Sequence, residues 1–166
     1  MDNIQIRLLT TLDKEAFKEH MNRLDSISKN YRFFGGMSKY AIEDYVNKSF
    51  NHKCFGNCDI KCEKECCVPT GIYYGAFDGD YLCGVGQLQP ISKSCAELAF
   101  SIDDNYRKKG LGILLFQAIK DIAIAFHYTT LNLIILPENI AMRNLAIKFG
   151  VKFEFSDGVL NGRLKL

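Results

Sequence analysis

The sequence lacks a strong charge of either sign, a long apolar run and any internal repeat. Lysine and arginine together number 21 and aspartate and glutamate number 19, so the formal net charge is only +2. Proteins that bind nucleic acid carry a basic patch or stripe, and because none is evident here we expect no nucleic-acid partner. No apolar stretch approaches the roughly 18 residues that a membrane-spanning helix requires, so we expect no membrane partner either.

The N-terminal residues MDNIQIRLL lack the basic region and the apolar run of a secretory signal. We therefore expect a cytoplasmic protein. Hydrophobic residues make up 48% and charged residues 24% of the 166 positions. This is the balance of an ordinary globular protein and excludes disordered, collagen-like and coiled-coil classes. The length predicts one domain that spans residues 1–166.

Two hydrophobic periods alternate along the chain, and together they predict an α/β domain. Asp78-Gly79-Asp80 separates two strand patterns and indicates a hairpin. The continuous apolar run 131–136 is typical of a strand covered on both faces. Strands are expected at about 4–8, 72–77, 81–88, 96–102 and 131–136, with two more around Asp157-Gly158; helices are expected at about 12–25, after an N-cap at Ser38, at 110–126 and at 139–149, and an aromatic turn at 31–36.

One predicted strand leads into a loop that opens directly into the longest predicted helix. At such a helix start, unpaired backbone N–H groups and the positive end of the helix dipole attract anions. Gly110 and Gly112 let a phosphate approach the backbone closely, and Arg107, Lys108 and Lys109 add positive charge beside them. The third glycine of the dinucleotide-binding fingerprint and the Gly-Lys-Ser/Thr ending of a P-loop are both absent. The remaining pattern is R-x-x-G-x-G between a strand and a helix.

This loop resembles the signature of the GNAT superfamily of acetyl-CoA-dependent N-acetyltransferases, with Arg107, Gly110 and Gly112 at the signature positions. A second family block, an Asn after the next strand and a helix that ends in Lys-x-Gly, is matched by Asn139 and by residues 146–150. The order of elements agrees along nearly the whole chain. The resemblance implies a single-domain GNAT-like α/β fold, whose mixed, mostly antiparallel central sheet of six to seven strands is flanked by about four helices. Residues 31–34 and 96–100 are similar to a bacterial branch that includes protein-lysine acetyltransferases.

The resemblance also implies a binding site for acetyl-CoA as cosubstrate. The pyrophosphate of acetyl-CoA would rest on the backbone of the 107–113 loop. Its pantetheine arm would run along the preceding strand, and an Asn beyond the next strand would contact the cofactor. The implied cofactor-binding residues are Phe100, Ile102, Arg107, Lys108, Lys109, Gly110, Leu111, Gly112, Ile113 and Asn139.

The implied reaction is direct attack of a primary amine on the acetyl thioester, the amine belonging to a protein lysine, a protein N-terminus or a small molecule. A lysine-like amine has a pKa of about 10.4 in solution, so at neutral pH it must first lose a proton. Glu97, which stands in the middle of a predicted strand, is the expected general base. Many relatives use a tyrosine as general acid where this chain has Ala146. The alternative is therefore a catalytically idle domain that binds CoA or another ligand as a sensor or partner module.

The three histidines are expected in surface or loop positions.

Seven cysteines are many for a chain expected in a reducing compartment. Cys83 and Cys95 lie in strand patterns and are expected to be small buried hydrophobic residues. The other five lie in an expected insertion at about 52–68, and three residues separate each neighbouring pair among Cys54, Cys58, Cys62 and Cys66. Four thiolates suit tetrahedral zinc. A segment with free or oxidised thiols would hold no metal, and the sequence leaves both interpretations open.

Overall fold

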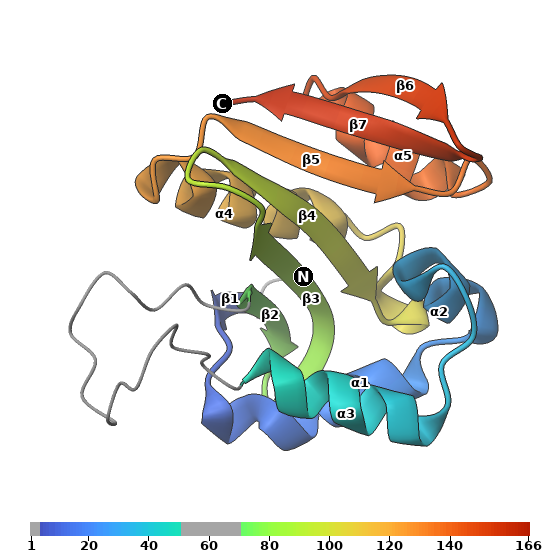
Figure 1. The fold of residues 1–166 in the computed structure, drawn as a ribbon. Coiled ribbons are helices and arrows are strands. Elements are labelled where there is room, and N and C mark those ends of the chain that lie inside the picture. The colour runs from blue at the N-terminus through green and yellow to red at the C-terminus, as the bar shows by residue number, and fades with distance from the viewer. Residues whose placement is uncertain (1–3, 51–70) are drawn as a thin grey trace, which may run out of the picture.

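The structure is a computed structural model that describes residues 4–50 and 71–166. One mixed sheet of seven strands runs through this part of the chain in the order β1-β2-β3-β4-β5-β7-β6 (Figure 1). Neighbouring strands are antiparallel except β4 and β5, which are parallel. In chain order the elements are β1 (Ile4–Leu8), α1 (Lys14–Arg23), α2 (Ser26–Phe33), α3 (Lys39–Ser49), β2 (Ile72–Asp78), β3 (Tyr81–Pro90), β4 (Cys95–Ile102), α4 (Leu111–Ala125), β5 (Thr130–Ile135), α5 (Ile140–Lys148), β6 (Lys152–Ser156) and β7 (Val159–Lys165).

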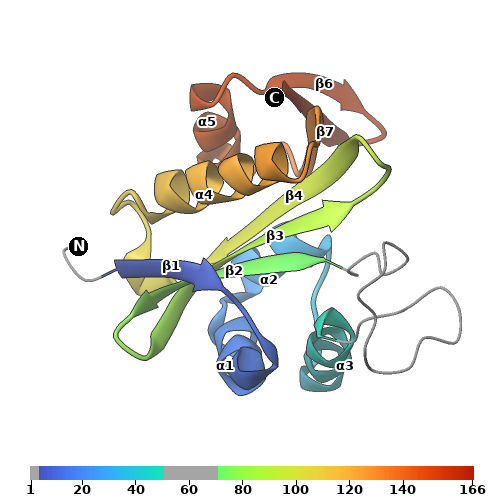
Figure 2. The same cartoon turned by 90° about the vertical axis from the view of Figure 1, so that its left-hand side faces the viewer.

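Helices cover the two faces of the sheet unequally. Helices α4 and α5 lie on one face, and α1 and α3 lie on the other, below the strands β1 to β4 (Figure 2). Phe116 of α4 is fully buried in the core against α5 and the middle strands. Phe17 of α1 is fully buried on the opposite face, where it packs beside Tyr73. No described helix packs on that second face over β5, β7 and β6, so this half of the sheet is covered on one side only.

Local capping and turn formation occur at two places where the sequence predicts them. The side chain of Ser38 accepts a hydrogen bond from the N–H of Ala41, which confirms the predicted N-cap of α3. The predicted hairpin between β2 and β3 is also confirmed, with Gly79 at a φ of 60° in the turn. The remaining predicted strands and the two C-terminal helices are present with boundaries shifted by one or two residues.

Helix α2 corrects the expected aromatic turn at residues 31–36. Asp25 caps α2, because its carboxylate accepts a hydrogen bond from the N–H of Ser28 at 2.5 Å. The helix then continues to Phe33 and ends at Phe34, which adopts the left-handed conformation with φ 56°. Only the end of the aromatic segment is a turn, and with α2 the described residues form five α-helices where about four were expected.

Two further expectations change in detail. The helix expected at 12–25 is a short 3-10 turn over Thr11–Asp13 followed by α1. The strand expected to be covered on both faces, β5, is covered on one, because Leu131 and Leu133 are buried whereas Ile134 is 40% exposed. Within residues 4–50 and 71–166, no helix has both the length and the hydrophobicity that crossing a membrane would require.

Candidate functional site

Strands β4 and β5 pair over three residues and then part. The last pair is Glu97 of β4 with Asn132 of β5, and beyond it both strands continue without pairing to each other. Figure 1 shows the two strands diverging toward their C-terminal ends. Because paired residues project to the same face of a sheet, Glu97 and Asn132 lie side by side where the opening begins.

The edge of β4 that faces this opening has a regular backbone pattern. The N–H of Asp103 donates to the carbonyl of Cys83 on β3, at 2.9 Å. Because hydrogen bonding alternates along a strand, the backbone groups of Leu98, Phe100 and Ile102 point away from β3, toward β5. The backbone groups of Phe100 and the N–H of Ile102 lie beyond the last β4–β5 residue pair, so an extended ligand can hydrogen-bond to them as an added strand would, whereas the Ile102 carbonyl accepts a hydrogen bond from Arg107.

The loop after β4 holds a run of unpaired backbone donors. In the described part of the chain, nothing accepts a hydrogen bond from the N–H groups of residues 108–112. Gly110 has a φ of 84° and precedes α4 as its N-cap, and Lys108 has a φ of 58°. Lys108 and Lys109 are both exposed. Free N–H groups, a helix start and two ammonium groups together form a site for a negatively charged group.

Arg107 has a different place in this loop from the two lysines. Its guanidinium forms ion pairs with Asp104 and with Asp25, the N-cap of α2, the second at 3.4 Å. It also donates to the hydroxyl of Ser28 and to the carbonyl of Ile102. The Arg107 side chain therefore ties the loop to α2 and to the end of β4, and the lysines supply the exposed charge.

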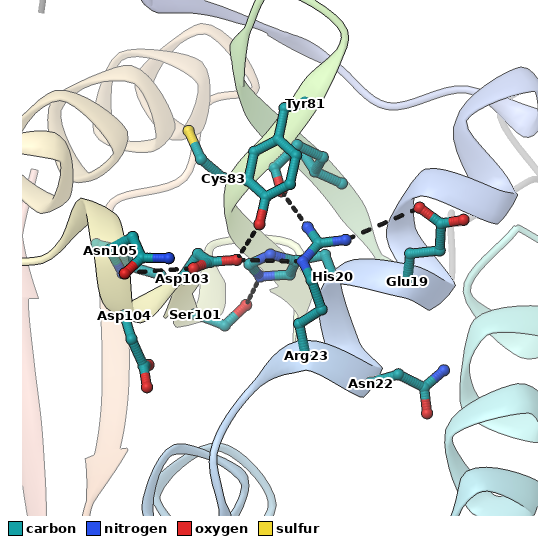
Figure 3. A network of polar contacts seen from close by, with 12 residues as sticks. Glu19, His20, Asn22, Arg23, Tyr81, Cys83, Ser101, Asp103, Asp104 and Asn105 are labelled. Atoms are coloured by element: carbon teal, nitrogen blue, oxygen red, sulfur yellow. Dashed lines mark hydrogen bonds and ion pairs between the residues drawn. The ribbon is translucent and has the colours of Figure 1, made fainter.

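A buried carboxylate holds the start of the same loop in place (Figure 3). Asp103 accepts a hydrogen bond from Tyr81 at 2.7 Å and forms an ion pair with Arg23 of α1 at 3.2 Å. Burial raises the pKa of Asp103, but the hydrogen bonds from Tyr81, Arg23 and the Asn105 N–H outweigh it, and the pKa lies below its ordinary value. Asp103 is thus an ionised anchor between α1, β3 and the loop that follows β4.

His20 of α1 lies beside this anchor and corrects the expectation that it is a surface or loop residue. It is fully buried, and its Nε2 lies 2.9 Å from the hydroxyl of Ser101 on β4. Burial, with the nearby Arg23 cation, lowers the pKa of His20 to about 4. The imidazole is therefore neutral at physiological pH. His127 is exposed, as expected, and His52 lies outside the described residues.

A hollow of about 490 Å³ opens on the helix-free face, next to the point where β4 and β5 part. Glu97, Asn132 and Ile134 form one side of it, and Lys152 and Arg163 of the C-terminal hairpin form another. The Oδ1 atom of Asn132 is buried, and it has no hydrogen-bond partner among the described residues. An unpaired buried carbonyl oxygen is costly, so this atom is suited to receive a donor from a ligand.

Two other residues of the implied site, Asn139 and Ala146, contribute to capping and to the hydrophobic core. Asn139 caps α5, with its Oδ1 accepting a hydrogen bond from the N–H of Met142 at 3.1 Å. Ala146 is fully buried in the core, so no hydroxyl is available there to act as an acid. The sequence did not single out Asn132, Lys152 or Arg163. Their juxtaposition depends on pairing between strands, which no local motif reports.

The cysteines are only partly described. Cys83 is buried as expected, and burial raises the pKa of its thiol to about 11, whereas Cys95 is only half-buried. The four candidate zinc ligands Cys54, Cys58, Cys62 and Cys66 lie outside the described residues. In residues 4–50 and 71–166, no three His, Cys, Asp or Glu side chains are grouped as a metal site would need.

A comparison with family models identifies the family, and a comparison with solved structures shows the same fold. A model of the acetyltransferase (GNAT) family matches residues 38–151. No curated protein matches the chain by sequence. The fold is similar to the GNAT domain of S. lividans PAT, at 20% identity and a TM-score of 0.80, with 98% of this chain and 90% of that chain covered.

Two further solved structures share the fold and carry a cofactor. The PaiA N-acetyltransferase from Thermoplasma acidophilum, in complex with coenzyme A, is 20% identical with a TM-score of 0.69, covering 98% of this chain and 99% of that one. The spermidine N-acetyltransferase from Vibrio cholerae, in complex with CoA and spermine, is 18% identical with a TM-score of 0.71, covering 99% and 96%. At these identities the likeness is one of fold.

Proposed function

The chain belongs to the acetyltransferase (GNAT) family, and from that membership we propose that it transfers an acetyl group from acetyl-CoA to a primary amine by direct attack. One observation carries this proposal. A single strand, β4, connects the anion-binding loop at its C-terminal end to Glu97 at the point where β4 leaves β5. The similar fold of proteins solved with CoA, and in one case with spermine, supports the choice of cosubstrate and of an amine acceptor.

Acetyl-CoA would lie along this strand. Its pyrophosphate would accept hydrogen bonds from the free N–H groups of residues 108–112, and Lys108 and Lys109 would neutralise part of its charge. Its pantetheine arm would follow the open edge of β4 past Ile102 and Phe100. Five residues of strand span about 17 Å, which is enough for an extended arm to bring the thioester close to Glu97.

The reaction would take place where the strands part. Glu97 would accept a proton from the attacking amine, either directly or through water. The amine nitrogen would form a bond to the acetyl carbon while the carbon–sulfur bond breaks and CoA leaves as thiolate. A backbone N–H on the open edge of β4 would stabilise the developing oxyanion. Ala146 is buried at the position where many relatives have a tyrosine acid, and we propose that the thiolate leaves without a protein acid at that position.

Acetyl transfer is tested with purified protein, acetyl-CoA and a panel of amines that includes a lysine peptide, a peptide with a free N-terminus and small amines. Thiol release and the mass of the product report the reaction. We expect amine-dependent CoA release and one added acetyl group. Acetyl-CoA binding without transfer to any amine would indicate the idle binding module instead. Absence of acetyl-CoA binding would contradict the whole proposal.

A further inference from the structure

The Glu97–Asn132 pair is part of a polar row that crosses four strands. Asn132 of β5 lies opposite Arg163 of β7, and Arg163 lies opposite Lys152 of β6. Residues directly opposite each other share a face of the sheet. The four side chains therefore share the face that no described helix covers, and all four line the same hollow.

The hollow contains charges of both signs that are not paired with one another. Glu97 and Glu154 supply two carboxylates, and Lys152 and Arg163 supply two cations. None of the four forms an ion pair with any other residue in the described ranges. Glu97 lies alone at the β4 end of the hollow, whereas Lys152 and Arg163 lie at the β7–β6 end together with Glu154, so that end has two cations and one carboxylate.

Asn132 stands between the two ends of the row. Its Oδ1 atom is buried and without a partner among the described residues, which is an observation independent of the charges. A carbonyl oxygen accepts hydrogen bonds and donates none, so it is suited to the N–H of an amine rather than to an anion. The Oδ1 atom of Asn132 therefore adds a second acceptor for an amine beside Glu97, on the side toward Arg163.

We propose that the acceptor is a small amine that also carries a carboxylate, as a free amino acid does. This inference rests on the proposed function and adds the class of acceptor. The amine lies against Glu97 and Asn132, and the carboxylate lies against Arg163 and Lys152. Neighbouring strands are about 4.8 Å apart, so the backbones of Glu97 and Arg163 are about 10 Å apart. Because both side chains are long and project into the hollow, the space between their charged ends matches a small zwitterion.

The same charges disfavour other acceptors. A polyamine would place further positive charge against Arg163 and Lys152, and a like-charge contact at close range is repulsive. A phosphate-bearing amine would place two negative charges in a hollow that already contains Glu97 and Glu154. A single carboxylate is the anion that leaves the occupied hollow closest to neutral.

The test compares L-amino acids with their carboxamides, which keep the amine and lose the negative charge, and with spermine as a polycation. For the unmodified protein we expect kcat/KM to favour the amino acids over their carboxamides by about tenfold or more, the scale of a charge-assisted hydrogen bond. The double variant Arg163→Met/Lys152→Met should lose that preference, with the carboxamide rates within about twofold of the starting protein. Lys165→Met is the matched control, because Lys165 is exposed on the same face of β7 but does not line the hollow.

Two outcomes would overturn this inference while leaving acetyl transfer intact: a preference for spermine or carboxamides, or an equal loss for acids and carboxamides in the double variant. Direct binding gives a second readout that does not depend on turnover. Amino acids titrated into CoA-saturated protein should shift the NMR signals of β6 and β7 amides, and unchanged signals would contradict the inference. Failure of every amine to react, with acetyl-CoA bound, would contradict the proposed function instead.

Discussion

The two halves of the sheet differ in how they are covered, and this difference separates two tasks. Strands β1 to β3 and the C-terminal end of β4 lie between helices on both faces, with Phe17 buried on one side and Leu115 on the other. Strands β5, β7 and β6 are covered by helix on one face only, and Arg163 is exposed on the bare face while its neighbour Leu164 is buried. The covered half is packed on both sides, and the bare half is accessible to a ligand.

The proposed chemistry lies along the seam between these halves. The covered half fixes the proposed phosphate loop, residues 107–113, through Asp103, Arg23 and Tyr81. The bare half contributes Asn132 and the cations of the hollow. Glu97 is the last residue of β4 that pairs with the bare half. Substitutions in the covered half should therefore affect acetyl-CoA binding or stability. Substitutions at the seam should affect turnover.

The largest expected effect is at the seam. Glu97→Gln keeps the shape of the side chain and removes the base, so kcat should fall by about 10²–10⁴-fold. Acetyl-CoA affinity, measured by calorimetry, should stay within about twofold because the phosphate loop is unchanged. Asp121→Asn, a carboxylate change on the exposed surface of α4, is the control and should retain full activity. A loss of less than tenfold in Glu97→Gln would remove Glu97 from the role of base.

The second largest effect is expected in the covered half, where His20 makes the free energy of unfolding depend on pH. The pKa of His20 is about 4 in the folded protein and about 6.5 when unfolded, so below pH 6.5 the unfolded chain binds a proton that the folded chain rejects. This contribution to stability is present above pH 6.5 and is lost progressively as the pH falls toward 4. Between pH 7 and pH 4.5 the loss from this group should be about 2–3 kcal/mol in urea unfolding.

His20→Gln cannot take up this proton, so its stability should fall by about 2–3 kcal/mol less over the same range. Ser101→Ala is the matched control, because it removes the hydroxyl beside Nε2 and leaves the titrating ring in place. It should keep the pH slope of the starting protein. Equal slopes in the starting protein and His20→Gln would show that His20 does not titrate as its burial requires.

A smaller effect on acetyl-CoA affinity is expected when one glycine on each side of the seam is replaced by alanine. Gly110 before α4 and Gly158 in the β6–β7 turn have φ values of 84° and 80°. Alanine at either position is strained by about 1–2 kcal/mol. Only Gly110→Ala should also weaken acetyl-CoA binding, by about tenfold, because it turns the N–H groups of the phosphate loop away from their anion. Similar acetyl-CoA affinities for the two variants would contradict the location of the phosphate site.

The smallest effect is expected from metal removal. Residues 51–70 connect α3 to β2, away in sequence from the 107–113 loop. Protein prepared under reducing conditions and treated with a chelator should bind acetyl-CoA within about twofold of the untreated protein. Elemental analysis distinguishes the two interpretations of the cysteines, since a zinc site would hold about one equivalent and free thiols none. A large loss of acetyl-CoA affinity on chelation would place the cysteine segment in the cofactor site.

Local patterns in the sequence predict most of the fold. The β2–β3 hairpin, the cap at Ser38 and the strand–loop–helix around Gly110 each depend on neighbouring residues, and each is present. The sequence predicts a turn instead of helix α2, because aromatic residues followed by two glycines indicate a turn. The signal for the helix was the cap residue Asp25. The burial of His20 was also readable, since it lies three residues after Phe17 and on the same helical face.

The features that the sequence does not predict depend on contacts between strands and helices that are far apart along the chain. The row from Glu97 to Lys152 exists because four strands meet in one register, and a slip of one residue would turn these side chains to the other face. The exposure of one face of β5 is also a long-range property, because it depends on which helices pack against that strand. The role of Glu97, the cofactor contacts of Asn139 and the insertion at 52–68 stay predictions.

A crystal structure with acetyl-CoA bound tests the account most directly, because it locates both ends of the cofactor relative to the seam. We expect the pyrophosphate within about 3 Å of N–H groups from residues 108–112. We also expect the pantetheine arm along the open edge of β4 and the acetyl carbon between Glu97 and Asn132. Pyrophosphate bound elsewhere, or an acetyl group out of reach of Glu97, would contradict the assignment of β4 as the strand that joins cofactor binding to catalysis.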